Sequence, residues 1–189
     1  GMQGMREELE DLSFQTLMPD AHAAIVMQLE KLRAQTANAI PKIEKELAER
    51  LRQNGIKVQI QGREKKPYSI YNKTQRKQVA FEQLSDIYGF RVIVRTVEEC
   101  YRALGVIHLA WPMVPGRFKD YISTPKQNDY RSIHTTVIGP NRRRVEMQIR
   151  TDEMHRVAEY GIAAHAMYKD GERLTGGRNI VKDTKKTYA

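Results

Sequence analysis

The sequence predicts an α+β domain, in which a mixed β-sheet is flanked by helices and preceded by a helical arm. Apolar residues recur at helical spacing through much of the span from Pro19 to Leu51. Strand-like and helical segments then follow one another along the chain, as a mixed fold requires. The strand-like segments 133–138 and 144–150 flank a Gly-Pro-Asn-Arg turn signal, so at least one strand pair should be antiparallel.

The first 55 residues are expected to form a linker and a helical arm. The opening Gly-Met-Gln-Gly-Met looks partly like a cloning remnant, and Arg6–Leu17 is a short charged lead-in to which we assign no chemistry. Pro19 and Asp20 suit a helix start. The helical pattern is interrupted at Pro41 and resumes as far as Leu51, just before Gly55, so the arm should be kinked or paired.

Residues 56–169 are expected to form the main domain, and residues 170–189 a flexible tail. The span 111–128 contains three prolines and should be mostly loop, with a short strand near Tyr121. Loops of this length are often functional. The other expected elements are strands at 56–62, 90–95, 133–138 and 144–150, and helices at 68–77, 97–109 and from Thr151 as N-cap to about Lys169.

Composition narrows the possible classes of protein. A chain of 189 residues with 40% hydrophobic residues suits one compact domain. It has no apolar run long enough to span a membrane and no signal-peptide pattern, so a cytoplasmic location is the default expectation. Cys100 is the only cysteine, which excludes an intrachain disulfide and a Cys-x-x-Cys zinc site. The net charge of +9 favours a polyanionic partner: nucleic acid, acidic membrane or nucleotide phosphates.

Two carboxylates are candidates for magnesium-dependent phosphoryl chemistry. Alternation along segment 144–150 puts Glu146, Gln148 and Arg150 on the polar face of a strand. Asp86 precedes another expected strand, so the two acids could meet over one face of the sheet. On spacing alone, two ordinary surface acids are the more common explanation.

Basic residues occur before, between and after these acids. Converging cations suit a triphosphate, although a solvated basic face or a nucleic-acid site would use the same residues. The sequence contains no P-loop, Gly-x-Gly-x-x-Gly, His-Glu-x-x-His or His-Asp motif. His134 differs from the helical histidines because it lies on an expected strand directly after the long loop. The cations are Arg63, Lys65, Lys66, Lys73, Arg91, Arg95, Arg117, Lys119 and Lys126.

Five ordered motifs together resemble the synthetase domain of the RelA/SpoT family. Segment 8–14, E-L-E-D-L-S-F, and the helical arm resemble the link between hydrolase and synthetase domains in long members. The resemblance implies a fold like that of nucleotidyltransferases of the polymerase β type. The motifs are G-R-E-K-K-P-Y-S-I-Y-N-K (62–73), D-I-Y-G-F-R-V-I-V (86–94), P-G-R-F-K-D-Y-I (115–122), P-K-Q-N-D-Y-R-S-I-H-T-T-V (125–137) and V-E-M-Q-I-R-T (145–151).

The resemblance implies a role for each matched position. Asp86 would hold Mg2+, and Glu146 would share the metal or orient and deprotonate the 3′-hydroxyl of the acceptor. On the ATP side, Arg63 and Arg91 would sandwich the adenine, and Lys65, Ser69, Lys73 and Lys119 would contact the phosphates. On the GDP or GTP side, Tyr130 would stack on guanine, Lys126, Asn128 and His134 would bind the ribose and diphosphate, and Gln148 would lie nearby. Lys66, Arg95, Arg150, His22, His108, His155 and His165 are expected to be structural or solvent-exposed.

The implied reaction is that of a GTP pyrophosphokinase, with ATP and GDP or GTP as substrates and AMP as a product. R-F-K-D at 117–120 resembles the version found in bifunctional members, so a longer parent should carry hydrolase and C-terminal regulatory domains. Asp129 stands where many members have glycine, which suits a left-handed turn because aspartate adopts that conformation more readily than most residues. Two alternatives stay open: a catalytically silent nucleotide-sensing domain, and an RNA-binding module supported by charge alone.

Overall fold

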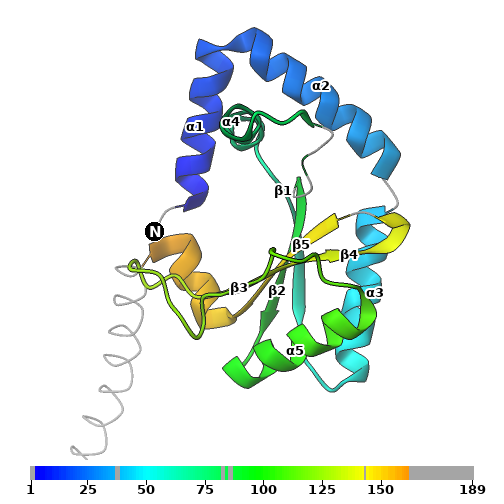
Figure 1. Ribbon diagram of the computed structural model, residues 1–189. Coiled ribbons are helices and arrows are strands. Elements are labelled where there is room, and N and C mark those ends of the chain that lie inside the picture. The colour runs from blue at the N-terminus through cyan, green and yellow to red at the C-terminus, as the bar shows by residue number, and fades with distance from the viewer. Residues whose placement is uncertain (1–2, 37–38, 82–83, 85–86, 143, 162–189) are drawn as a thin grey trace, which may run out of the picture.

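The computed structural model describes residues 3–36, 39–81, 84, 87–142 and 144–161. Within them, five strands form a single mixed sheet with helices on both faces (Figure 1). The expected mixed α+β architecture is therefore confirmed. The elements are α1 (Gln3–Leu17), α2 (Pro19–Thr36), α3 (Ala39–Gln53), β1 (Gln59–Glu64), α4 (Pro67–Lys77), β2 (Tyr88–Val94), α5 (Val97–Ala110), β3 (Lys119–Asp120), β4 (Ile133–Ile138), β5 (Arg144–Thr151) and a final helix over 152–161.

The sheet has the strand order β1-β2-β5-β4-β3. Strands β4 and β5 form the expected antiparallel hairpin, joined by a 3-10 turn at Pro140–Arg142. Strand β2 pairs in parallel with β5, and β1 pairs antiparallel with β2. The short strand expected near Tyr121 is β3, which pairs antiparallel with β4 at the edge of the sheet.

One face of the sheet carries the main hydrophobic core. Helices α3 and α5 pack on it through Leu47, Leu51 and Ile107, which are 0 to 1% exposed. Helix α5 begins where expected because Thr96 and Glu99 form a reciprocal capping box, which satisfies backbone donors at the helix start. The alternation of β5 buries Val145, Met147 and Ile149 in this core, and leaves its polar residues on the other face.

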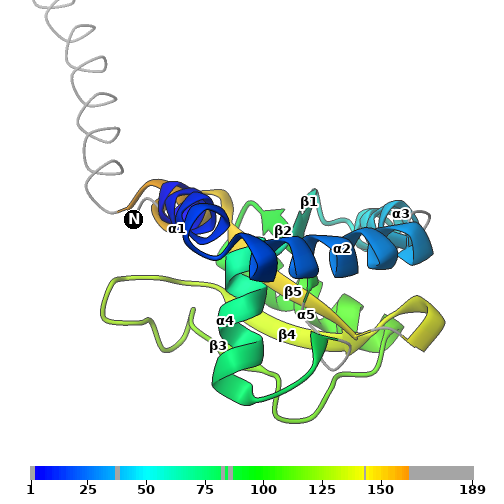
Figure 2. The same ribbon diagram turned by 90° about the horizontal axis from the view of Figure 1, so that it is seen from above.

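Helices α1, α2 and α4 form a second packing unit, separate from the main core. Ile25 and Leu29 of α2 pack against Ile70 of α4, together with Phe81 and Ile87. Viewed from above, α4 crosses beneath α1 and α2 (Figure 2). The start of α1 lies beside helix 152–161 in both views, so the two helices border one region of the molecule (Figures 1 and 2).

Some element boundaries differ from expectation, whereas the start of the last helix agrees with it. The first strand is β1, Gln59–Glu64, instead of 56–62, because Ile56 is fully buried in the core and its backbone N–H donates to the Leu51 carbonyl after α3. Pro41 lies in the first turn of α3, where proline leaves no helical hydrogen bond unmade. Thr151 accepts from the Met154 N–H at 3.2 Å, as an N-cap should. The expected end of that helix and the tail 170–189 fall outside the described residues.

None of the helices in the part of the chain that the structure describes is long and apolar enough to cross a membrane.

Cys100 offers a probe of folding. It is fully buried in α5, and burial raises the pKa of its thiol to about 12. The thiolate is the reactive form, so the folded protein should react with a disulfide reagent only after unfolding. We expect a single thiol to be modified, at a rate that rises steeply through the denaturation midpoint. Fast modification of the native protein would contradict this burial.

Candidate active site

The open face of the sheet carries a row of predicted site residues. In register, Arg91 of β2 is followed by Gln148 of β5, His134 of β4 and Lys119 of β3. Neighbouring strands lie about 4.8 Å apart, so consecutive members of this row are within side-chain reach of each other. Residues spread over almost 60 positions of the sequence are therefore brought together by strand pairing.

Glu146 lies in the adjacent row, opposite Gly89 of β2. A Cβ at position 89 would come within 3.2 Å of the Glu146 carbonyl oxygen and 3.7 Å of its Cβ. A side chain there would crowd the backbone and Cβ of Glu146. Gly89 therefore has a steric reason to be glycine, although its backbone angles do not require it.

A cleft of about 400 Å³ opens above these rows. It is bounded by the sheet, by the loop before β4, by α1 and by helix 152–161. A second, smaller pocket beside it contains Lys65, Gly89, Phe90 and Glu146 and shares the side chains of Arg63, Arg91 and Gln148 with the cleft. The cleft is lined by Glu7, Arg63, Arg91, Lys126, Asn128, Tyr130, His134, Gln148, Arg150, Val157, Ala158, Glu159 and Gly161.

Glu146 lines the smaller pocket and lies between two basic side chains. Its Oε2 is 3.7 Å from Lys65 Nζ and its Oε1 is 3.6 Å from His134 Nδ1. These separations are too long for hydrogen bonds. The Glu146 side chain is 20% exposed, so an incoming hydroxyl group can reach it. This arrangement suits a carboxylate that orients a hydroxyl group or accepts its proton.

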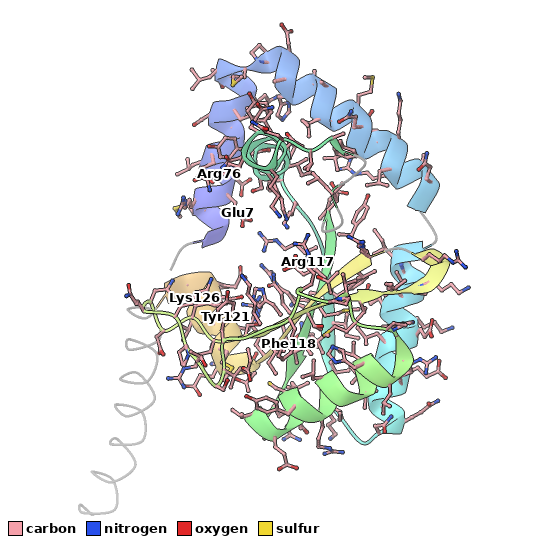
Figure 3. All side chains as sticks on the ribbon, viewed as in Figure 1. Glu7, Arg76, Arg117, Phe118, Tyr121 and Lys126 are labelled. Atoms are coloured by element: carbon pink, nitrogen blue, oxygen red, sulfur yellow. The ribbon has the colours of Figure 1, made fainter. Side chains whose placement is uncertain are left out.

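Tyr130 forms the centre of an aromatic cluster at the other end of the cleft. Its hydroxyl lies 2.8 Å from His134 Nε2, and its ring makes edge contacts with His134 and Tyr121. Lys126, which is labelled beside Tyr121 in Figure 3, has its Nζ 4.5 Å from the centre of the Tyr121 ring. The same Nζ lies 5.2 Å from the centre of the Tyr130 ring. Burial raises the pKa of Tyr130, so the hydroxyl is protonated near neutral pH.

The turn before Tyr130 has the conformation that the sequence suggested. Asp129 has a φ of 56°, in the left-handed region, and its N–H donates to the Lys126 carbonyl at 2.9 Å. The Asn128 side chain accepts from the Tyr130 N–H at 3.3 Å. The turn thereby places the side chains of Lys126, Asn128 and Tyr130 around one cleft.

The two arginines predicted to hold adenine are each bound by a carboxylate. Glu7 of α1 accepts from Arg63 Nη2 through both of its oxygens, and Glu159 lies 2.7 Å from Arg91 Nη2. Figure 3 shows Glu7 pointing from α1 toward the sheet. Helix α1 is anchored on α4, because Phe14 stacks on Tyr71. Glu7 therefore lines the cleft, although it lies in a segment to which we assigned no chemistry.

Arg150 also lines the cleft, although we expected it to be structural. No signal in the sequence distinguished it from the exposed arginines nearby. Three predicted ATP contacts line neither the cleft nor the smaller pocket. Ser69 and Lys73 are half-buried on α4, and Lys119 is exposed at the sheet edge.

The predicted metal ligand Asp86 falls outside the described residues. In the part of the chain that the structure describes, no three His, Cys, Asp or Glu side chains are grouped so that they could hold a metal ion. The pairing of Asp86 with Glu146 stays a prediction.

A family profile described as "Region found in RelA / SpoT proteins" matches residues 62–173, more than half of the chain. A GTP pyrophosphokinase rsh from Brucella ovis is 59% identical over 97% of this chain. A GTP pyrophosphokinase from Myxococcus xanthus is 44% identical over 98% of it. The chain spans about a quarter of the length of these relatives, 24% in each case.

Solved structures show the same fold. The small alarmone synthetase 1 from Bacillus subtilis, bound to its product pppGpp, has a TM-score of 0.60 at 22% identity, over 82% of this chain and 99% of that one. A GTP pyrophosphokinase family protein from Streptococcus pneumoniae has a TM-score of 0.56 at 20% identity, over 86% and 98%. The matched motifs and the shared fold agree, and the chain belongs to the RelA/SpoT family.

Proposed function

We propose that this chain is an alarmone synthetase that transfers the β,γ-pyrophosphate of ATP to the 3′-hydroxyl of GDP or GTP and releases AMP. The observation that supports the proposal is a pair of adjoining pockets over one face of the sheet: the smaller contains Glu146, the larger contains Tyr130, and Arg63 and Arg91 line both. Its relatives are named GTP pyrophosphokinases, and a structural neighbour was solved with pppGpp. This geometry would allow two nucleotides to bind side by side, with the Glu146 carboxylate near both of them.

In the proposed mechanism, Arg63 and Arg91 stack on the adenine, because planar guanidinium groups suit the face of a base. Tyr130 stacks on guanine. Glu146 would then lie beside both nucleotides, where it would orient the 3′-hydroxyl and accept its proton as the oxygen attacks the β-phosphorus and AMP leaves. Positioning and charge neutralisation contribute most to such a transfer, and covalent help from the protein is not needed.

The remaining assigned side chains would bind phosphates and ribose. Lys65, Ser69, Lys73 and Lys119 are proposed to contact the ATP phosphates, and Lys126, Asn128, His134 and Gln148 the acceptor. Lys65 supports this assignment because it already lies 3.7 Å from Glu146, at the expected site of transfer. The positive charges would neutralise the phosphates as they approach each other.

Magnesium is the proposed cofactor. Carboxylate oxygens are the ligands that Mg2+ prefers, and Glu146 provides them beside the proposed phosphate site. Asp86, three residues before Gly89 in the chain, is proposed as the second ligand. When bound, the ion would neutralise charge on the transferred pyrophosphate.

The reaction is tested directly by incubating the chain with magnesium, radiolabelled ATP and either GDP or GTP. We expect labelled tetra- or pentaphosphate to form together with an equal amount of AMP. Binding of both nucleotides without product would favour a catalytically silent, nucleotide-sensing domain instead.

Tyr130→Ala should weaken the acceptor more than the donor. Base stacking is worth about 1 to 3 kcal/mol, so the KM for GDP should rise roughly 5- to 100-fold while the KM for ATP changes little. Tyr121→Ala is the matched control, because Tyr121 contacts Tyr130 without lining the cleft. Equal increases in the KM of both nucleotides would contradict the assignment of Tyr130 to the acceptor.

One observation favours a restrained enzyme as the second candidate: Glu7 and Glu159 already bind the two proposed adenine arginines. Glu7→Gln should weaken this competition and lower the KM for ATP roughly two- to fivefold, the range expected for one partly exposed ion pair. Glu10→Gln is the control, since Glu10 pairs with Arg6 on the same helix. An unchanged KM for ATP in Glu7→Gln would argue that the contact does not restrain binding.

We propose that the chain consists of an arm (1–55), a synthetase domain (56–169) and a tail (170–189). Because the relatives are about four times longer, the parent protein is proposed to carry hydrolase and regulatory domains as well.

A further inference from the structure

Arg150 is a buried cation within the cleft. It is 2% exposed, and it is the largest fully buried side chain among the described residues. It lies on the open face of β5, two residues after Gln148, where helix 152–161 borders the cleft. Charged side chains are rarely this buried unless a partner compensates them.

The described protein compensates this charge only in part. Arg150 Nη2 donates to Gln148 Oε1 at 3.2 Å, whereas its buried Nε has no hydrogen-bond partner. Glu159 attracts the guanidinium but forms its short ion pair with Arg91. Burial lowers the pKa of Arg150, and the neighbouring Arg91 and Arg63 lower it further, against the opposing effect of Tyr130 and Glu159. A buried donor left unsatisfied costs about 1 to 3 kcal/mol, which a bound acceptor would recover.

Besides these charged groups, the surroundings of Arg150 include an aromatic ring and apolar side chains. Tyr130, the proposed stacking partner of guanine, is close enough for its hydroxyl to interact electrostatically with Arg150. Val157 and Ala158 add apolar surface to the same cleft. In contrast, Lys126 and Asn128 are exposed, where a hydrated diphosphate would be bound at lower desolvation cost.

We infer that Arg150 is a specificity-determining residue that donates hydrogen bonds to the O6 and N7 edge of the acceptor guanine, an inference that rests on the proposed function. Guanine presents two acceptors on this edge, and the arginine fork matches them in a bidentate contact. Adenine carries an amino group, a hydrogen-bond donor, in place of O6. The guanidinium has only donors, so it cannot bind this group. Arg150 thereby selects guanine at the acceptor site, while stacking on Tyr130 accepts any base.

The test compares acceptors that lack one of these two atoms. The wild-type chain is assayed with ATP and GDP, with 7-deaza-GDP, which lacks the N7 acceptor, and with 2-aminopurine riboside diphosphate, which lacks O6. We expect each analogue to lower kcat/KM for the acceptor roughly tenfold, as the loss of one base-edge contact should. This comparison needs no variant, so it stands even if substitution of Arg150 impairs folding.

The variant Arg150→Met supplies the second half of the test. Its kcat/KM for GDP should fall about tenfold or more, and its discrimination between GDP and either analogue should shrink to within about twofold. The KM for ATP should stay near the wild-type value, which also reports that the variant is folded. Arg144→Met is the matched control, because Arg144 is exposed at the other end of β5 on the same face.

Two failures are distinguishable. If the wild-type chain uses both analogues as well as it uses GDP, the assignment of Arg150 is wrong but the proposed function stands. The same holds if the analogues lower kcat/KM in Arg150→Met as much as they do in the wild type. A wild-type chain that makes no product from GDP would overturn the proposed function and the role of Arg150 with it.

Discussion

Glu146→Gln should lower kcat for pyrophosphate transfer roughly 10²- to 10⁴-fold, the range associated with losing a general base. The amide keeps the size of the side chain but can neither accept the hydroxyl proton nor attract Lys65 and His134 by charge. The KM values should change little, because Tyr130 and the arginines would still hold the two bases. Rapid mixing with labelled ATP and saturating GDP measures this loss.

The matched control for this loss is Glu98→Gln. Glu98 is exposed in the first turn of α5, a helix packed on the opposite face of the sheet, so its substitution should leave kcat unchanged. Thermal unfolding should be similar for both variants and the wild type. Asp86→Asn should reproduce the loss seen in Glu146→Gln. Near-normal turnover by folded Glu146→Gln would remove Glu146 from the mechanism.

Arg91→Lys should raise the KM for ATP about tenfold with a smaller change in kcat. Lysine retains the positive charge but loses the planar surface that stacks on adenine, a contact worth about 1 to 2 kcal/mol in a desolvated site. It also breaks the geometry of the ion pair with Glu159, which would allow helix 152–161 to move. Initial rates over a range of ATP concentrations, at saturating GDP, give both constants.

Arg95→Lys is the control for Arg91→Lys. Arg95 directly follows β2 and is exposed, so the same chemical change there should leave the KM for ATP unaltered. A reduced affinity for GDP with normal use of ATP in Arg91→Lys would instead assign Arg91 to the acceptor site.

Local patterns in the sequence were sufficient to predict most of the secondary structure. The period of two along β5 correctly separated Met147, in the core, from Glu146 on the open face. Helix α5 was predictable because its start carries a capping box, whose partners are three residues apart. Asp129 adopts a positive φ, as its place in the motif suggested. Such features depend on near neighbours, which the linear sequence contains.

Long-range pairing was decided by the tertiary structure. The parallel pairing of β2 with β5 sets Arg91 beside Gln148, which no short-range pattern encodes. Glu7 and Arg63 are 56 residues apart, and their contact depends on how α1 packs against α4 through Phe14. Alternation along a strand reveals which face a residue is on, but it does not reveal what covers that face.

The sequence by itself therefore determined the family, the order of the elements and the face on which Glu146 and Gln148 lie. Only the tertiary structure placed carboxylates on Arg63 and Arg91 and buried Arg150 at the border of the cleft. The physical reason is that burial and ion pairing are properties of assembled surfaces. Whether an arginine on a polar strand face is exposed or buried depends on the elements that pack around that end of the sheet.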